Sequence, residues 1–119
     1  MDGLWQLVII TGAGRGFGRA SAAAFAQANC LPLHLVLVAR SEHELQAARD
    51  EVLEGSTVRP KDSATQPIVD ILSCDLGNLD HLEASVEAIY SLVKASGRAY
   101  DRAVFVNNAG SLGPQQVIY

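Results

Sequence analysis

The stretch VIITGAGRGFGRA, from Val8 to Ala20, constrains the fold more than any other part of the chain. An apolar run is followed directly by four closely spaced glycines: Gly12, Gly14, Gly16 and Gly18. A glycine-rich turn between a strand and a helix leaves the first helical amides open, and the helix dipole adds partial positive charge there. Side chains would block an approaching ligand, and some positions of such a turn need a positive φ. The stretch therefore predicts a pyrophosphate site at the start of a helix.

The expected strands are short apolar runs that mostly do not alternate with polar residues. They are Leu7–Ile10, Leu35–Val38, Ile68–Leu72 and Val104–Val106. Strands that are apolar on both faces are typical of a parallel sheet covered by helices on both sides. Helical segments are expected between the runs, so strands and helices alternate along the chain. This alternation predicts an α/β fold, a doubly wound parallel sheet of about four strands and three helices with right-handed crossovers.

The helical segments carry local signals of their own. The first, Gly16–Ala28, is rich in alanine and suits close packing on a sheet. The second has Ser41 and Glu44 at the spacing of a capping box, and Gly55 closes it. The third has an apolar stripe at helical spacing, made of Leu79, Leu82, Val86, Ile89 and Val93. The chain has 119 residues, which suits a single domain over residues 1–119.

The spacing of the glycines separates several classes of nucleotide-binding loop. Gly12, Gly16 and Gly18 fit the pattern T-G-x-x-x-G-x-G, which starts at Thr11. They do not fit G-x-G-x-x-G, because Phe17 stands where that pattern requires glycine. No G-x-x-x-x-G-K-[ST] sequence occurs, which argues against a P-loop NTPase. A tight strand–helix turn without a ligand is the structural alternative.

Two arginines favour a phosphorylated ribose as part of the ligand. Arg40 ends the second apolar run, at about the place where an NAD-binding fold carries an acidic residue for the ribose 2′-hydroxyl. A guanidinium suits a 2′-phosphate, so Arg15 and Arg40 together favour NADP(H) over NAD(H). Ser41 is open to two interpretations, a helix cap and a phosphate ligand, while solvated surface positions are the alternative for the arginines. A methyltransferase that uses S-adenosylmethionine is disfavoured, because that fold commonly carries an acidic residue where Arg40 stands.

Two further motifs follow the third and fourth runs. Asp75-Leu76 places a carboxylate where it could accept from an adenine amino group, although helix initiation accounts for Asp75 equally well. The tetrapeptide NNAG, residues 107–110, has small residues that would let a cofactor ribose approach. Its Asn amides are expected to tie neighbouring strand ends.

Together these motifs resemble the short-chain dehydrogenase/reductase family, and the resemblance runs from about Val8 to Gly113. It implies a Rossmann-type sheet and an oxidoreductase that uses NADP(H). The cofactor-binding residues predicted from the motifs and the resemblance are Gly12, Ala13, Gly14, Arg15, Gly16, Phe17, Gly18, Arg40, Ser41, Asp75, Leu76, Asn108, Ala109 and Gly110. Within the family, RGFGR and NNAGSLG resemble enzymes that reduce pterin side-chain carbonyls with NADPH in tetrahydrobiopterin synthesis. A pterin-like carbonyl substrate and a homodimeric full-length enzyme are implied in the same way.

The chemistry of that family depends on a serine and a Tyr-x-x-x-Lys pair located after the NNAG strand, and no such pair follows it here. YSLVK, from Tyr90 to Lys94, matches the bare pattern but precedes that strand, so we interpret it as structural. No catalytic residue is therefore assigned. We expect the N-terminal, cofactor-binding part of a reductase, from a splice form or a fragmentary gene model, without turnover of its own. A non-catalytic NADP-binding or interaction module is the alternative, and the fourth strand is expected to be an apolar sheet edge.

Net charge and the placement of cysteine and histidine bear on which partners and metals the chain could bind. The net charge is −4, so nothing overall favours nucleic acid or an anionic membrane as a partner. Cys30 and Cys74 fit no metal-ligand spacing and are expected as small buried thiols, while His34, His43 and His81 fall on three different segments. No metal site is therefore expected. Without a visible signal peptide or an apolar run of about 20 residues, the expected setting is cytoplasmic.

Overall fold

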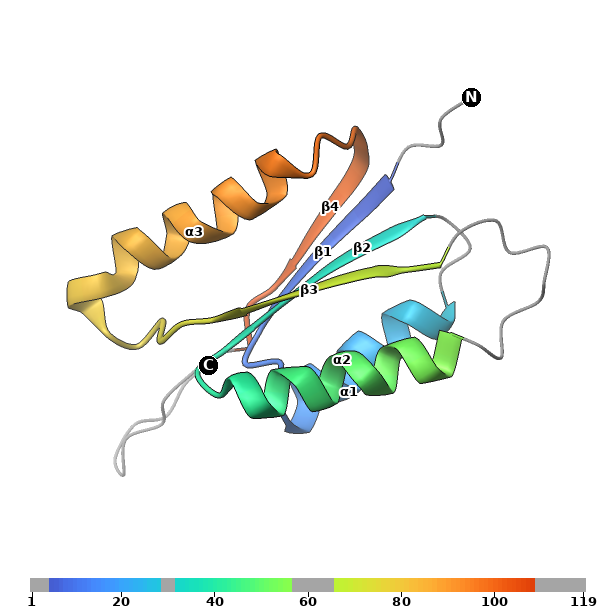
Figure 1. The fold of residues 1–119 in the computed structure, drawn as a ribbon, viewed down its shortest axis with the longest axis horizontal. Coiled ribbons are helices and arrows are strands. Elements are labelled where there is room, and N and C mark those ends of the chain that lie inside the picture. The colour runs from blue at the N-terminus through green and yellow to red at the C-terminus, as the bar shows by residue number, and fades with distance from the viewer. Residues whose placement is uncertain (1–4, 29–31, 57–65, 109–119) are drawn as a thin grey trace.

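The computed structural model describes residues 5–28, 32–56 and 66–108, and strands alternate with helices along them (Figure 1). The elements are β1 (Trp5–Thr11), α1 (Gly16–Ala28), β2 (Leu33–Ala39), α2 (Glu42–Ser56), β3 (Ile68–Ser73), the short 3₁₀ helix η1 (Leu79–His81), α3 (Leu82–Ala95) and β4 (Tyr100–Val106). Every predicted strand is present, and each extends beyond its apolar run by at least one residue. The α/β alternation expected from the sequence is confirmed.

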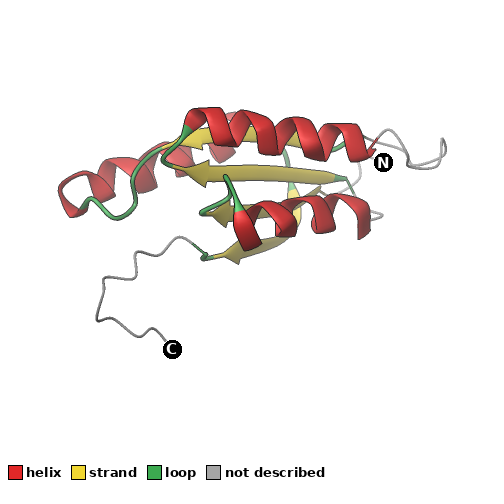
Figure 2. Ribbon diagram, turned by 90° about the horizontal axis from the view of Figure 1, so that it is seen from below, coloured by secondary structure: helices red, strands yellow, loops and turns green. Residues whose placement is uncertain are grey.

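The strands form one parallel sheet in the order β3-β2-β1-β4. Figure 2 shows the arrows running in the same direction. The chain winds outward from β1 to β3 and then returns to add β4 on the other side of β1. The direction of winding therefore reverses between β1 and β4, and in open α/β sheets ligands bind outside the carboxyl ends of the strands at such a point. As expected, β4 forms an edge of the described sheet.

Helices cover both faces of the sheet, with α1 and α2 on one side and α3 on the other (Figure 1). Alternate residues of a strand point to opposite faces, so a strand covered on both faces is apolar throughout. In β2, Leu35 and Leu37 pack in the layer under α1 and α2, whereas Val36 and Val38 pack with Ile89 of α3. This double burial is the physical reason for the unbroken apolar runs in the sequence.

The apolar stripe of the third helical segment is only partly used for packing. Asn78 accepts a hydrogen bond from the backbone N–H of Asp80 over 3.1 Å and begins η1, so α3 itself starts only at Leu82. Ile89 is 8% exposed, whereas Leu79 and Val86 are 78% and 54% exposed. The stripe therefore packs against the core at Ile89 and is exposed to solvent at Leu79 and Val86.

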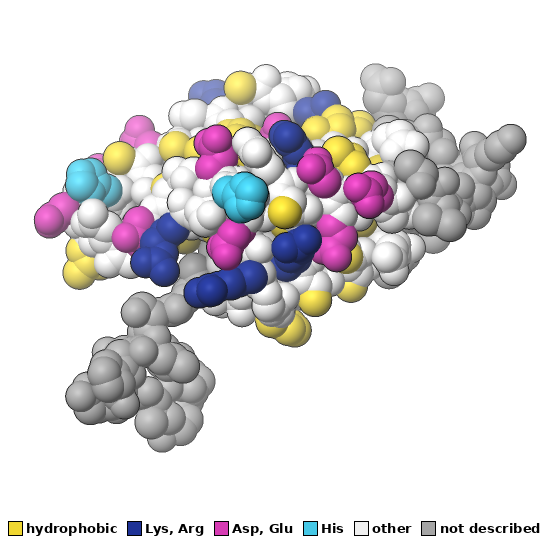
Figure 3. All heavy atoms as spheres, turned by 60° about the horizontal axis from the view of Figure 1, so that its bottom comes forward, with side chains coloured by type: hydrophobic (Ala, Val, Ile, Leu, Met, Phe, Trp, Pro, Cys, Tyr) yellow, Lys and Arg dark blue, Asp and Glu magenta, His cyan; other side chains and the backbone are white. Residues whose placement is uncertain are grey.

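On the face shown in Figure 3, acidic and basic side chains are mixed, and no large area carries charge of a single sign. Among the described residues, no helix has the length and apolar character needed to cross a bilayer. That same part of the chain holds no cluster of three or more His, Cys, Asp or Glu residues suited to a metal ion. Cys74 is half-buried, and Cys30 lies outside the described residues.

Candidate functional site

A pocket of about 850 Å³ opens at the carboxyl ends of β1, β2 and β3, a volume within the usual range for small-molecule sites. Its wall contains most of the residues that the sequence predicted, namely Gly12, Gly14, Arg15, Gly16, Phe17, Arg40, Ser41, Asp75, Leu76 and Asn108. Ala13 and Gly18 are described but lie buried beside this wall rather than in it. Ala109 and Gly110 lie outside the described residues.

The glycine loop adopts the backbone that the sequence suggested at two of its positions. Gly12 has a φ of +63° and Gly16 a φ of +62°, both in the left-handed region that side chains other than glycine rarely enter. α1 begins at Gly16 and carries no acidic residue in its first turn. The positive end of the helix dipole is therefore not balanced by a carboxylate of that turn, which suits an anion at this wall of the pocket.

Gly18 has a different role, because its lack of a side chain serves packing within the protein. A Cβ at this position would overlap the carbonyl oxygen of Gly12 and lie 2.9 Å from Nδ2 of Asn108. Gly14 is similarly crowded, since a Cβ there would lie 2.9 Å from the Cβ of Glu44. These two glycines let the loop, α1 and α2 approach one another closely.

The Asn residues after β4 fix the glycine loop to the end of the adjacent strand, as the sequence predicted. Thr11 donates from Oγ1 to Oδ1 of Asn107 over 3.3 Å, and its Oγ1 accepts from the backbone N–H of Asn108 over 2.9 Å. The side-chain amide of Asn108 donates to the carbonyl oxygen of Gly12 over 3.3 Å. These bonds join the carboxyl ends of β1 and β4 where the direction of winding reverses.

A second wall of the pocket comes from the end of β2 and the start of α2. The hydroxyl of Ser41 accepts from the backbone N–H of Glu44 over 3.2 Å, so its role as a helix cap is confirmed. The carbonyl of Arg40 accepts from Oγ of Ser73 over 2.8 Å, which holds this position against the end of β3. The side chains of Arg15 and Arg40 are both exposed at the pocket.

Asp75 contributes the wall that follows β3. Its Oδ1 accepts from the backbone N–H of Gly77 over 2.9 Å, a turn that orients the carboxylate, while Asn78 takes the capping role at η1. Helix initiation is thus assigned to Asn78, and Asp75 remains exposed at the pocket.

The pocket also includes residues that sequence reasoning did not assign to a ligand: Val38, Ala39, Glu44, Cys74 and Gly77. Four of them, Val38, Ala39, Cys74 and Gly77, lie within two positions of a predicted site residue in the sequence. They line the pocket because neighbouring residues at a strand end lie close together in space. Glu44 was identified only as a capping residue. It lies one helical turn after Ser41, and that spacing alone places it on the same side of α2.

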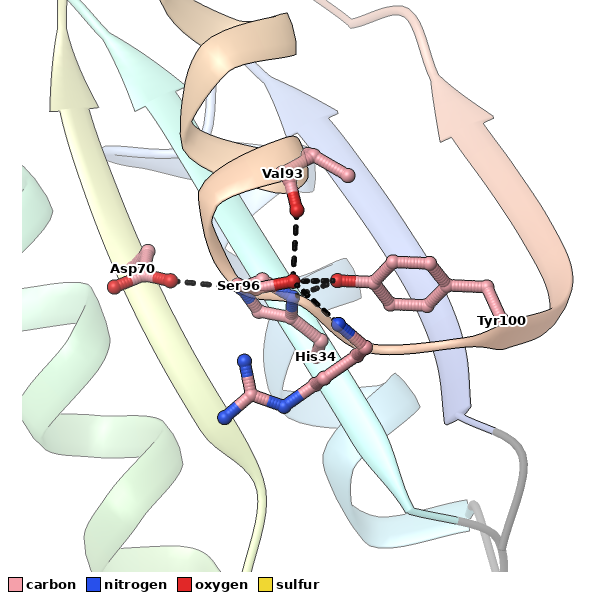
Figure 4. A network of polar contacts seen from close by, with 6 residues as sticks. His34, Asp70, Val93, Ser96 and Tyr100 are labelled. Atoms are coloured by element: carbon pink, nitrogen blue, oxygen red, sulfur yellow. Dashed lines mark hydrogen bonds and ion pairs between the residues drawn. The ribbon is translucent and has the colours of Figure 1, made fainter. Parts of the chain in front are cut away.

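A separate polar network lies away from the pocket, toward the amino ends of the strands (Figure 4). The fully buried His34 of β2 has Nε2 2.7 Å from Oδ2 of Asp70 and Nδ1 2.7 Å from the hydroxyl of Tyr100. Ser96, at the end of α3, has its Oγ 2.9 Å from the same hydroxyl and donates to the carbonyl of Val93 over 2.7 Å. The network joins β2, β3, β4 and α3, so His34 has a structural role in the described fold.

The sequence profile described as short chain dehydrogenase matches residues 6–118, almost the whole chain. The chain belongs to the short-chain dehydrogenase family. The predicted family resemblance is therefore confirmed.

Individual relatives carry the comparison further. The chain is 35% identical over 107 residues to sepiapterin reductase of Meriones unguiculatus, covering 88% of this chain and 36% of that protein. It is 33% identical over 105 residues to the dehydrogenase/reductase SDR family protein 7-like of Anopheles gambiae, covering 88% of this chain and 29% of that protein. The chain thus spans about a third of the length of these relatives.

The fold is similar to that of a solved reductase. L-sorbose reductase from Gluconobacter frateurii, crystallised with NADPH and L-sorbose, aligns with a TM-score of 0.69 at 26% identity, over 96% of this chain and 36% of that one. The likeness supports the doubly wound, Rossmann-type sheet as a partial version of a larger fold.

The Tyr90–Lys94 pair of this short-chain dehydrogenase lies on α3, outside the pocket wall. Tyr90 is 65% exposed, and Nζ of Lys94 lies 5.8 Å from the centroid of its ring. The two residues contact each other on the surface of the helix. This placement agrees with the structural interpretation of the YSLVK match.

Proposed function

We propose that this chain is the N-terminal, NADP(H)-binding part of a carbonyl reductase of the sepiapterin reductase type. The observation that carries the proposal is one pocket that unites the glycine loop at the start of α1 with Arg15, Arg40 and Ser41. Similarity to sepiapterin reductase over most of the chain supports the pterin side-chain ketone as substrate. We extend the proposal to a homodimeric, cytoplasmic full-length enzyme.

The residues of the pocket fit this cofactor. Gly16 belongs to the wall, and a Cβ added to it would meet no described atom within 4 Å, so the loop leaves room beside the first amides of α1. Those amides suit the pyrophosphate. Arg15, Arg40 and the hydroxyl of Ser41 suit the 2′-phosphate, because guanidinium groups bind phosphate with charge-assisted hydrogen bonds. We propose that Asp75, which is exposed in the pocket wall, accepts from the adenine amino group.

When bound, NADPH supplies a hydride to the carbonyl carbon, and the carbonyl oxygen takes a proton from an acid. Within the described residues, the pocket wall includes no tyrosine or lysine that could serve as that acid. We therefore propose that the chain's own residues bind and orient the cofactor, and that the proton donor lies elsewhere in a longer form. A non-catalytic NADP-binding module is the second candidate, favoured by the same composition of the wall.

Titration calorimetry of the 119-residue chain with NADPH, NADH and S-adenosylmethionine tests the proposal. We expect NADPH to bind more tightly than NADH and S-adenosylmethionine not to bind. Failure of NADPH to bind would overturn the proposal. Turnover of sepiapterin with NADPH by the purified chain would show that the acid lies within these residues, against the partial-enzyme proposal.

A further inference from the structure

We propose that Glu44 sets how strongly the pocket distinguishes a 2′-phosphorylated nucleotide from one with a free 2′-hydroxyl, by weakening the preference for the phosphate. This inference rests on the proposed function, because it concerns the same nucleotide pocket. It assigns a specificity-determining role to a residue that the glycine and arginine motifs do not include.

The position of Glu44 is fixed by the cap of α2. Its backbone N–H donates to Oγ of Ser41 over 3.2 Å, and its side chain is half-buried in the pocket wall. The side chain lies against the glycine loop: a Cβ built on Gly14 would be 2.9 Å from the Cβ of Glu44 and 3.1 Å from its Oε1. The carboxylate therefore lies between the start of α2 and the loop that carries Arg15.

The charges of the wall are balanced rather than purely basic. Arg15 and Arg40 bring two positive charges, while Glu44 and Asp75 bring two carboxylates. Glu44 lies in the wall formed by the end of β2 and the start of α2, together with Arg40 and Ser41. Asp75 belongs to the turn after β3. A carboxylate in the same wall as the arginines lowers the positive potential available to a phosphate.

The two kinds of nucleotide respond to that carboxylate in opposite ways. A phosphate monoester carries about 1.5 to 2 negative charges near neutral pH, so the Glu44 carboxylate repels it. A free 2′-hydroxyl is neutral and can donate a hydrogen bond to a carboxylate oxygen. Glu44 thus weakens binding of the nucleotide with a 2′-phosphate and does not weaken binding of the nucleotide with a free 2′-hydroxyl.

Adenosine 2′,5′-bisphosphate and adenosine 5′-monophosphate are the probes, because they differ by the 2′-phosphate and do not require a nicotinamide site. The dissociation constants of both are measured by calorimetry on the 119-residue chain and on Glu44→Gln, which keeps the size of the side chain. Glu44→Ala provides a second variant that removes the carboxylate with a good helix-forming residue.

Glu42→Gln is the matched control. Glu42 lies in the same first turn of α2, is exposed, accepts from Nε2 of Gln46 over 3.4 Å, and does not belong to the pocket wall. It carries the same charge and the same relation to the helix dipole. The two positions differ in burial and in their relation to the pocket, since Glu42 is exposed and Glu44 is half-buried in the wall.

We expect Glu44→Gln and Glu44→Ala to raise the preference for the bisphosphate by about threefold to tenfold at low salt, and Glu42→Gln to leave it within about twofold. The gain should shrink as salt is raised from about 0.05 M to 0.5 M, because screening weakens charge repulsion. A purely structural role of Glu44 would change both affinities together and without this salt dependence.

Each other outcome counts against a specific statement. If both probes bind and the Glu44 variants leave their ratio unchanged, or Glu42→Gln changes it equally, the role of Glu44 is overturned while the nucleotide pocket stands. If neither probe nor NADPH binds to the parent chain, the proposed function is overturned, and the inference with it.

Discussion

Asn108 donates from its side-chain amide to the carbonyl oxygen of Gly12 over 3.3 Å, although 96 positions separate the two residues in the sequence. Gly12 is also one of the loop positions with a positive φ, so this bond holds the loop at the residue where it leaves the path of β1. The end of β4 therefore shapes a binding loop that belongs to β1 and α1. A change at Asn108 should be felt in the glycine loop.

Asn108→Ala is expected to weaken NADPH binding several-fold and to lower the free energy of unfolding by about 1 kcal/mol, because the Gly12 carbonyl loses its partner. Calorimetry and urea denaturation measure the two effects. Asn78→Ala is the control: it removes the cap of η1, at a similar cost of about 1 kcal/mol, outside the pocket. Equal NADPH affinity in the Asn108 and Asn78 variants would contradict the role of Asn108 in the loop.

Gly18→Ala is expected to destabilise the fold by about 1 to 3 kcal/mol, since the added methyl overlaps the Gly12 carbonyl and backbone must shift. Gly55→Ala is the comparison, because Gly55 lies in α2 and its added Cβ would meet only Nε2 of Gln27 at 3.6 Å. In a helix this change gains up to about 1 kcal/mol. Thermal unfolding of both variants decides, and a Gly18→Ala protein as stable as its parent would refute the packing role.

The sequence predicted the sheet and the loop because both depend on local patterns. Unbroken apolar runs such as Leu35–Val38 follow directly from burial on two faces. The expectation that some loop positions need a positive φ is met at Gly12 and Gly16, although the spacing did not show which glycines these would be. Contacts between distant segments left no such pattern. The crowding of Gly14 by Glu44 is an example, since it depends on how closely α2 approaches the loop.

The same limit applies to the network around His34. The sequence shows only an isolated histidine in an apolar run, while Asp70 and Tyr100 reach its two ring nitrogens through the register of β3 and β4. The exposure of Leu79 and Val86 could not be predicted for a related reason. An apolar stripe in a sequence does not show where the sheet that it packs against ends.

Tyr100→Phe is expected to lower the free energy of unfolding by about 1 to 3 kcal/mol, because it leaves Nδ1 of the buried His34 without its hydroxyl partner. Tyr90→Phe, at an exposed position of α3, should change stability by no more than about 0.5 kcal/mol. Urea denaturation compares the two. Similar stabilities of both variants would show that the Tyr100 hydroxyl adds little to the network.

Arg40→Asp is expected to weaken NADPH binding by about 10-fold to 150-fold, the range that corresponds to losing a charge-assisted hydrogen bond of about 1.5 to 3 kcal/mol. NADH lacks the 2′-phosphate and should bind the variant about as well as the parent. Calorimetry with both nucleotides gives the ratio of affinities.

Two further variants separate charge at the pocket from charge elsewhere on the protein. Arg49→Asp makes the same charge change on α2 outside the pocket wall, so the NADPH to NADH ratio should stay near that of the parent. Arg40→Lys keeps the charge but removes the forked donors, so it should retain part of the preference for NADPH. An unchanged ratio in Arg40→Asp would refute the assignment of Arg40 to the 2′-phosphate, because a carboxylate at that position would repel the phosphate.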